Sequence, residues 1–226
     1  MRNLDVAVVG ATGAVGEIFL TLLAERNFPL GQLYPLASED SVGQTVRCQN
    51  RTFSVDAAES FDFSCVQLAF FSAGSEVAKR LVPKAVAAGC RVIDNSSAFR
   101  GVEQVPLVVP EINADAMFAD GPAKMIANPN CATIPFCLVC APLMTHYGIS
   151  SAEVVTFQSV SGSGRSGVSR LAAESISVLN GHPVEDFTSG PYRERIAFNV
   201  VPFIDQMDDN GFTAEEMKLY YETKKI

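Results

Sequence analysis

The sequence predicts an α/β fold in which a Rossmann-type parallel sheet domain precedes an α+β domain. An apolar run at residues 4–9 is followed by glycines at positions 10, 13 and 16 and then by a helical pattern. Further apolar runs alternate with helical patterns, which is typical of a parallel sheet with right-handed crossovers. Later strand candidates are longer and half polar, which indicates a second domain. The predicted domains are residues 1–128 and 129–226.

The composition is that of a globular protein without nucleic-acid or membrane partners. The chain has 226 residues, of which 48% are hydrophobic and 19% charged, and its net charge is −8. Because binding to a phosphate backbone requires a basic surface, this charge argues against general nucleic-acid binding. The N-terminus has no signal-peptide pattern, and no apolar stretch reaches the length of a membrane span. We therefore expect a cytoplasmic protein with reduced cysteines.

The turn at residues 10–16 is typical of a dinucleotide site. Glycines there allow a tight turn and a close approach of the backbone to a pyrophosphate, while the following helix directs its N-terminus at the negative charge. Tight turns also use glycine for steric reasons without any ligand. The position of this turn between a buried strand and a helix is what favours the site.

The second strand, residues 32–36, should end where the adenosine ribose of such a cofactor binds. It leads into Ser38, Glu39, Asp40 and Ser41. Small hydroxyl residues at positions 38 and 41 suit a 2′-phosphate and favour NADP. The two carboxylates would repel that phosphate unless they point away, so the residues leave NADP and NAD both open.

The remaining elements follow in chain order. The predicted strands are residues 66–71, 91–94, 107–109, 125–127, 153–158 and 195–200. The predicted helices are residues 76–88, a segment from Cys131 to near Gly148, residues 168–180, and a last helix with Thr213 as its N-cap. Because ligands bind at the carboxyl ends of parallel strands, the strand at 125–127 should bring Cys131 to the ligand-binding edge.

Cys131 is the candidate nucleophile. It follows the turn Asn128-Pro129-Asn130 and precedes an apolar run of helical period. Helix N-termini carry partial positive charge and unpaired N–H groups, which can lower a thiol pKa and hold an oxyanion. Cys137 and Cys140 form a C-x-x-C inside the same helix. Without a second pair they are expected to be core thiols, so no metal site is predicted.

Seven motifs together resemble the aspartate-semialdehyde dehydrogenase family over the whole chain. They are residues 10–16, Phe71–Gly74, Asp94–Arg100, Pro106–Glu111, Asn128–Ile134, Gln158–Gly162 and Glu215–Lys218. The resemblance implies a homodimer in which an NAD(P)-binding domain precedes a catalytic and dimerisation domain. It also implies NADP-dependent conversion of L-aspartyl 4-phosphate to L-aspartate 4-semialdehyde with release of phosphate, in the pathway to lysine, methionine and threonine.

The resemblance implies roles for the residues at matching motif positions. Cys131 would displace phosphate and form a thioacyl-enzyme that hydride then reduces, and Gln158 would position the substrate. Arg100, Asn130 and Lys218 match phosphate-binding positions, and Glu215 matches the residue that meets the substrate ammonium. Cofactor contacts are implied at Thr12, Gly13, Ala14, Val15, Ser161 and Gly162, in addition to Gly10, Gly16, Ser38 and Ser41 named from the turn and the second strand.

Three departures from the family pattern are visible. Asp40 stands where close relatives usually carry an arginine, which weakens the NADP assignment. Pro135 stands where glutamine is common, in a first helical turn that tolerates a missing N–H. The family's catalytic histidine and substrate-carboxylate arginine belong to a later segment that these residues do not include, and His146 and His182 do not match it. We therefore expect an incomplete second domain and a chain that acylates but turns over poorly.

Two other functions stay open on the sequence. A non-catalytic paralogue that binds nucleotide or pairs with a full-length subunit would not need Cys131, and thiol labelling would distinguish it. An N-acetylglutamyl-phosphate reductase would use the same acyl-phosphate chemistry, although the motif Glu215–Lys218 favours the aspartyl enzyme. In either enzyme the partners are a small acyl phosphate or aldehyde and phosphate.

Overall fold

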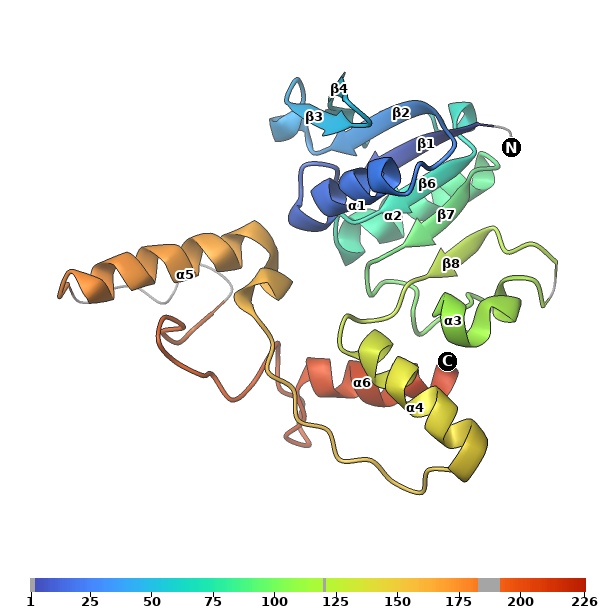
Figure 1. Cartoon of the computed structure of the whole chain (residues 1–226). Helices are drawn as coiled ribbons and strands as arrows, with labels where there is room; N and C mark the ends of the chain where they lie inside the picture. The colour runs from blue at the N-terminus through green and yellow to red at the C-terminus, as the bar shows by residue number, and fades with distance from the viewer. Residues whose placement is uncertain (1–2, 120, 183–191) are drawn as a thin grey trace. The chain divides into compact units, whose positions relative to one another are not determined.

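The computed structural model describes residues 3–119, 121–182 and 192–226, which Figure 1 traces from blue to red. The chain divides into two compact units. The first consists of Met1–Ser151 with Lys218–Ile226, and the second of Ala152–Met217. The predicted domain boundary at residue 129 is not tested by this division and stays a prediction.

The first unit is built on a six-stranded parallel sheet of order β5-β2-β1-β6-β7-β8. This arrangement confirms the predicted fold class. The strands are β1 Leu4–Val9, β2 Leu30–Ala37, β5 Asp56–Ala57, β6 Leu68–Phe71, β7 Arg91–Asp94 and β8 Met125–Ala127. The strand order reverses between β1 and β6. At such a switch point, open parallel sheets bind ligands beyond the carboxyl ends of their strands.

Helices cover both faces of this sheet because side chains alternate along each strand. Val8 belongs to a buried cluster that includes leucines of helix α1 (Ala14–Glu25). Its neighbour Val9 belongs to a second cluster that includes alanines and Leu81 of helix α2 (Ser75–Ala87). The continuous apolar run of β1 therefore reflects burial on both sides, as expected for a parallel strand.

A short antiparallel hairpin beside α1 and β2 was not predicted. It consists of β3 (Thr45–Cys48) and β4 (Arg51–Ser54). Gln49 and Asn50 between them both have positive φ, 47° and 61°, as in the tight turns whose twist matches that of a hairpin. The sequence signal is weak, since the turn contains no glycine.

The strand predicted at residues 107–109 is largely wrong. Among the described residues of this segment, Leu107 alone forms a bridge, to Ala127 of β8. Pro110 then begins helix α3 (Pro110–Asn113), because proline has no N–H for a ladder but fits the first turn of a helix. Single 3-10 turns connect other elements. They are η1 Glu39–Ser41, η2 Phe63–Cys65, η3 Ala114–Met117 and η4 Val160–Ser163.

Three longer helices were predicted and are present: α4 Thr133–Tyr147, α5 Gly164–Leu179 and α6 Ala214–Lys225. α4 begins two residues after its predicted start at Cys131, and α5 begins four residues before its predicted start at residue 168. The N-cap of α6 is Thr213, as predicted. The Thr213 N–H donates to the Glu216 carboxylate at 2.6 Å, and the Thr213 hydroxyl accepts from the Glu216 N–H at 3.2 Å, which closes a capping box. In the described part of the chain, none of the helices has the length and apolar character that a membrane span requires.

Two strands predicted in the second unit are wrong. Residues 153–158 pair with no other strand in the described ranges, and residues 195–200 contain turns. A strand needs a neighbour to satisfy its backbone groups. The N–H groups of Ile196 and Ala197 instead donate to the carboxylate of Glu174 on α5, at 2.8 and 2.9 Å.

Glu174 therefore anchors the segment after α5. Its side chain is 3% exposed, and it also pairs with Arg170 one helical turn earlier. Burial raises the pKa of Glu174, but the Ala197 N–H, the Arg170 guanidinium and the Ile196 N–H outweigh that effect, so the pKa lies below its ordinary value.

We expect Glu174→Gln to destabilise the second unit by about 2 kcal/mol near neutral pH, because three donors lose a buried carboxylate. A lowered folded-state pKa stabilises the fold above the unfolded value of about 4.3, and this stabilisation is lost as the pH falls through the folded pKa. Urea unfolding followed by circular dichroism should therefore depend less on acid pH in the variant. Glu153→Gln, at an exposed carboxylate of the same unit, is the control. An unchanged acid dependence in Glu174→Gln would contradict this role.

Candidate active site

Backbone contacts shape the glycine turn at the end of β1. Gly10 has a φ of +88°, and a Cβ there would lie 2.6 Å from the Ser72 carbonyl oxygen. A Cβ on Gly16 would lie 2.2 Å from the Gly10 carbonyl oxygen, whereas the nearest atom to a Cβ on Gly13 is 3.3 Å away. Packing therefore requires glycine at positions 10 and 16 but leaves some room at 13.

The same turn fits a dinucleotide. It follows β1 and touches the backbone just after β6, at the switch point of the sheet. Gly13 is the N-cap of α1, so no capping side chain occupies the start of that helix. Thr12 and Ala14 are half-buried, and Val15 is exposed. A helix N-terminus reached through a glycine turn offers N–H groups and a positive dipole end to a pyrophosphate.

The residues after β2 form the short turn η1. Ser38 precedes it and accepts a hydrogen bond from the Ser41 N–H at 2.9 Å through its carbonyl oxygen. Ser38, Glu39 and Asp40 are exposed, and Ser41 is half-buried. Both carboxylates are therefore accessible to solvent at the end of the strand where an adenosine ribose would lie.

The loop after β7 is fixed by a buried carboxylate. Asp94 is fully buried and accepts from the Ser96 N–H at 3.0 Å and from the Ser96 hydroxyl at 2.8 Å. Burial raises the pKa of Asp94, and the two Ser96 hydrogen bonds oppose that rise. Asn95 next to it accepts from the Asn128 side chain at 2.7 Å, which ties this loop to the segment after β8.

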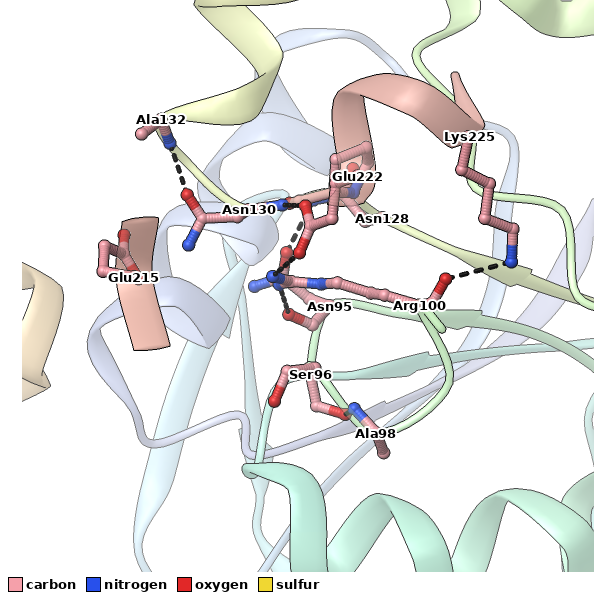
Figure 2. A network of polar contacts seen from close by, with 12 residues as sticks. Asn95, Ser96, Ala98, Arg100, Asn128, Asn130, Ala132, Glu215, Glu222 and Lys225 are labelled. Carbon is pink, nitrogen blue, oxygen red and sulfur yellow. Dashed lines mark hydrogen bonds and ion pairs between the residues drawn. The ribbon is translucent and has the colours of Figure 1, made fainter. Parts of the chain in front are cut away.

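Arg100, at the end of that loop, is held by two acceptors (Figure 2). Its Nη1 lies 3.1 Å from Oε1 of Glu222, and its Nη2 donates to the Asn95 carbonyl oxygen at 3.0 Å. The side chains of Arg100 and Glu222 are 11% and 6% exposed. The predicted phosphate-binding arginine is therefore a buried, ion-paired residue and not a solvated one.

Glu222 also holds the segment that carries the candidate nucleophile. Its Oε2 accepts from the Asn130 backbone N–H at 2.6 Å. The Asn130 side-chain oxygen in turn accepts from the Ala132 N–H at 2.8 Å. Asn130 therefore connects the residue after Cys131 to the Glu222 carboxylate. Asn130 is buried and Cys131 is exposed. The structure therefore brings Arg100, Asn130 and Cys131 into one hydrogen-bonded region.

Cys131 lies two residues before α4, whose N-cap is Ala132. Pro135 falls in the first turn, where its missing N–H is tolerated, as predicted. Cys137 and Cys140 are further along the same helix, and burial raises the pKa of the Cys137 thiol. Within the described ranges, no group of His, Cys, Asp and Glu side chains is arranged to hold a metal ion.

The second unit brings two further predicted residues together. The Gln158 amide donates to the Glu215 carboxylate at 3.0 Å, and both side chains are half-buried. Ser161 and Gly162 are exposed in the turn η4, where the Ser159 hydroxyl accepts from the Ser161 N–H at 3.2 Å. Lys218 belongs to the first unit with the rest of the end of α6, and it is half-buried.

Sequence reasoning missed three residues of this region: Glu222, Asn95 and Asn128. Glu222 follows Lys218 by one helical turn, but nothing local marks it, because its partner Arg100 is 122 positions away in sequence. Asn95 and Asn128 fall within motifs that were noted for their resemblance. Their signal was position at the carboxyl ends of neighbouring strands, β7 and β8, where side chains can meet.

Comparison with known proteins decides the family. Residues 5–119 match the model of the semialdehyde dehydrogenase NAD-binding domain, and residues 140–226 match the semialdehyde dehydrogenase dimerisation domain. An aspartate-semialdehyde dehydrogenase of Legionella pneumophila is 51% identical over 225 residues, which are 100% of this chain and 64% of the relative. One from Vibrio mimicus is 46% identical, with 70% of the relative covered. The chain belongs to the aspartate-semialdehyde dehydrogenase family.

A solved structure of a family member supports the same assignment. Aspartate semialdehyde dehydrogenase II of Vibrio cholerae, complexed with ASA, matches with a TM-score of 0.95 and 46% identity. The match covers 100% of this chain and 66% of that one. The chain thus spans about two thirds of the length of the aspartate-semialdehyde dehydrogenases it matches. The family model supports a nicotinamide cofactor for the first domain, and the roles of single residues stay predictions.

Proposed function

We propose that the protein containing this chain reduces L-aspartyl 4-phosphate to L-aspartate 4-semialdehyde with NADPH, through a thioacyl intermediate on Cys131. Family membership supports the reaction type. The observation that carries the proposal is the exposed Cys131 next to Asn130, whose backbone N–H shares the Glu222 carboxylate with Arg100. The candidate nucleophile therefore lies next to Asn130, which the Glu222 carboxylate connects to the Arg100 guanidinium. A guanidinium is well suited to bind phosphate oxygens.

In the covalent step, the Cys131 thiolate attacks the acyl carbon of the substrate. A C–S bond forms, the C–O bond to phosphate breaks, and phosphate leaves toward Arg100 and Lys218. The N–H groups of Ala132 and Ile134 already donate to Asn130, so the positive end of the α4 dipole is assigned to stabilise the oxyanion that develops. A nicotinamide cofactor held at the glycine turn would supply the hydride that reduces the thioester. Cys131 would then leave as the thiolate and free the aldehyde.

Two residues of the second unit are assigned to the aspartyl part of the substrate. Gln158 would position the acyl group, and Glu215 would meet the ammonium. The 3.0 Å hydrogen bond from Gln158 to Glu215 supports this assignment, because it fixes the orientation of the amide and leaves the carboxylate its negative charge. The family's dimerisation domain model and the exposed side chains of Val155 and Phe157 support a homodimer.

The cofactor is proposed to be NADP, held by the glycine turn and by Ser38 and Ser41. The exposed Asp40 opposes a 2′-phosphate in this position. We expect Asp40→Arg to tighten NADP binding by about fivefold while NAD binding changes little, because an arginine would meet the phosphate directly. Fluorescence titration with NADPH and NADH measures both.

Asp115→Arg makes the same charge change at an exposed site on the turn after α3 and serves as the control. If the two variants tighten NADP equally, the effect is one of net charge and the proposed placement of the 2′-phosphate is wrong.

The proposed function is tested by incubating the chain with L-aspartate 4-semialdehyde, NADP and phosphate and following NADPH at 340 nm. We expect one equivalent of NADPH in a first turnover, followed by a steady state that requires phosphate, because phosphate must release the thioester from Cys131 before the next turnover. The first equivalent should not need phosphate, because in this direction hydride leaves before phosphate attacks the thioester. Absent NADPH formation, or a steady state that does not need phosphate, would contradict the proposed chemistry.

A further inference from the structure

Glu222 is a buried carboxylate that the proposed mechanism does not use. It lies on the last turns of α6, is 5% exposed, and places its two oxygens on two different partners. Oε1 pairs with the Arg100 guanidinium at 3.1 Å, and Oε2 accepts from the Asn130 N–H at 2.6 Å. In Figure 2 the carboxylate sits between the arginine side chain and the backbone before Ala132.

These two partners belong to separate segments of the first unit. Arg100 follows β7, and Asn130 follows β8 and immediately precedes Cys131. One carboxylate therefore sets the distance between the predicted phosphate ligand and the predicted nucleophile. Because Glu222 is buried, its charge is stable only while both partners stay close to it.

Glu222 also connects these segments to the third predicted phosphate ligand. Lys218 precedes it by four residues on the same helix, so the two side chains project from the same face of α6. A fixed Glu222 consequently fixes the rotation of the helix that presents Lys218. The second acceptor of Arg100, the Asn95 carbonyl oxygen, completes the placement of the guanidinium.

Simple docking of the helix end is achieved by a different residue. Lys225 donates to the carbonyl oxygens of Arg100 and Val102, at 2.9 and 2.5 Å. It contacts the same loop as Glu222 but touches neither the guanidinium nor the Asn130 N–H. A substitution at Lys225 therefore tests the attachment of α6 without changing the contacts that Glu222 makes with Arg100 and Asn130.

From this arrangement we infer that Glu222 is a positioning residue. It holds the Arg100 guanidinium and the backbone before Cys131 at the separation that phosphate binding requires. The inference rests on the proposed function, because it assumes that phosphate binds beside Cys131. Glu222 touches neither substrate nor cofactor in this role. It acts by keeping the guanidinium and the backbone before the thiol at a fixed separation.

The test uses inorganic phosphate as the probe and the protection of Cys131 as the signal. The chain is alkylated with iodoacetamide at increasing phosphate concentration, and the modification of each cysteine is quantified by peptide mass spectrometry. Cys65, which is also exposed, serves as the internal reference. In the wild-type chain we expect phosphate to slow the alkylation of Cys131 and to leave that of Cys65 unchanged.

In Glu222→Gln we expect half-protection to need about tenfold more phosphate, because an amide cannot hold the guanidinium by charge. Glu222→Asp keeps the charge on a shorter side chain and should recover part of this loss. Lys225→Met should stay within about twofold of wild type. If Glu222→Gln does not fold by circular dichroism, Glu222→Asp compared with Lys225→Met decides alone.

Three results would overturn the inference. Equal loss in Lys225→Met would mean that Glu222 only docks the helix. Unchanged protection in Glu222→Gln and Glu222→Asp would mean that it positions nothing. Tighter phosphate binding in Glu222→Gln would mean that its carboxylate competes with phosphate for Arg100. An absence of protection in the wild-type chain is a separate result, which removes the proposed phosphate site and this inference with it.

Discussion

Gly16→Ala should destabilise the first unit by about 3 kcal/mol and abolish nucleotide binding. In an ordinary helix, replacing glycine by alanine stabilises by about 1 kcal/mol, so the expected sign is reversed here. The reason is the added Cβ, which would lie 2.2 Å from the Gly10 carbonyl oxygen and 2.9 Å from the Ala11 Cα. Both obstacles are backbone, so the turn itself must move, and the cost is that of overpacking.

Gly13→Ala is the matched control for this prediction. Gly13 lies in the same turn at a negative φ of −80°, and an added Cβ would approach the Gly10 carbonyl oxygen no closer than 3.3 Å. We expect its cost to stay below about 1 kcal/mol. Urea unfolding and NADPH titration measure both variants. Similar stability of the two would contradict the packing argument.

Cys131→Ser should lower the rate of first-turnover NADPH formation by roughly three orders of magnitude or more. A serine hydroxyl keeps the size of the side chain but is almost wholly protonated, so the nucleophile is lost while the fold is kept. Stopped-flow absorbance with L-aspartate 4-semialdehyde, NADP and phosphate measures the rate. Nucleotide affinity should change little, since serine keeps the size of the side chain and removes no contact that the proposal assigns to the cofactor.

Cys65→Ser controls for the general loss of an exposed thiol. Cys65 lies in the turn η2 of the same unit and has no part in the proposed site. Its variant should retain the wild-type first-turnover rate. If Cys131→Ser retained that rate as well, the covalent mechanism would be wrong.

The sheet and its ligand-binding edge could be predicted from sequence because the signals are local. The run at β1 is apolar on both faces, and the glycine turn after it has a steric cause that the structure confirms at Gly10 and Gly16. The cap of α6 at Thr213 is likewise a pattern of four consecutive residues. Each of these features depends on neighbours within one turn or strand.

The features that escaped prediction depend on distant partners. Whether residues 153–158 form a strand depends on a neighbouring strand, which the described chain does not supply. Ile196 and Ala197 follow a β-type pattern, yet a carboxylate on α5 takes their N–H groups. The role of Glu222 could not be seen because its two partners, Arg100 and Asn130, become neighbours through folding alone.

The environment of Cys131 also needed the structure. Its position before a helix was evident from the proline turn and the apolar run. The hydrogen bonds of Asn130 with Glu222 and with Ala132 were not evident from the sequence. These contacts fix the backbone around an exposed thiol. A thiol on a backbone held in place in this way is better suited to act as a nucleophile than a cysteine on a loosely held surface segment.

Acylation of Cys131 by an acyl phosphate is measured directly by the mass of the protein after brief mixing with L-aspartyl 4-phosphate without cofactor. We expect one aspartyl group per chain, located on the peptide containing Cys131, lost on treatment with hydroxylamine and absent from Cys131→Ser. No adduct, or an adduct spread over Cys65 and Cys140 as well, would contradict it.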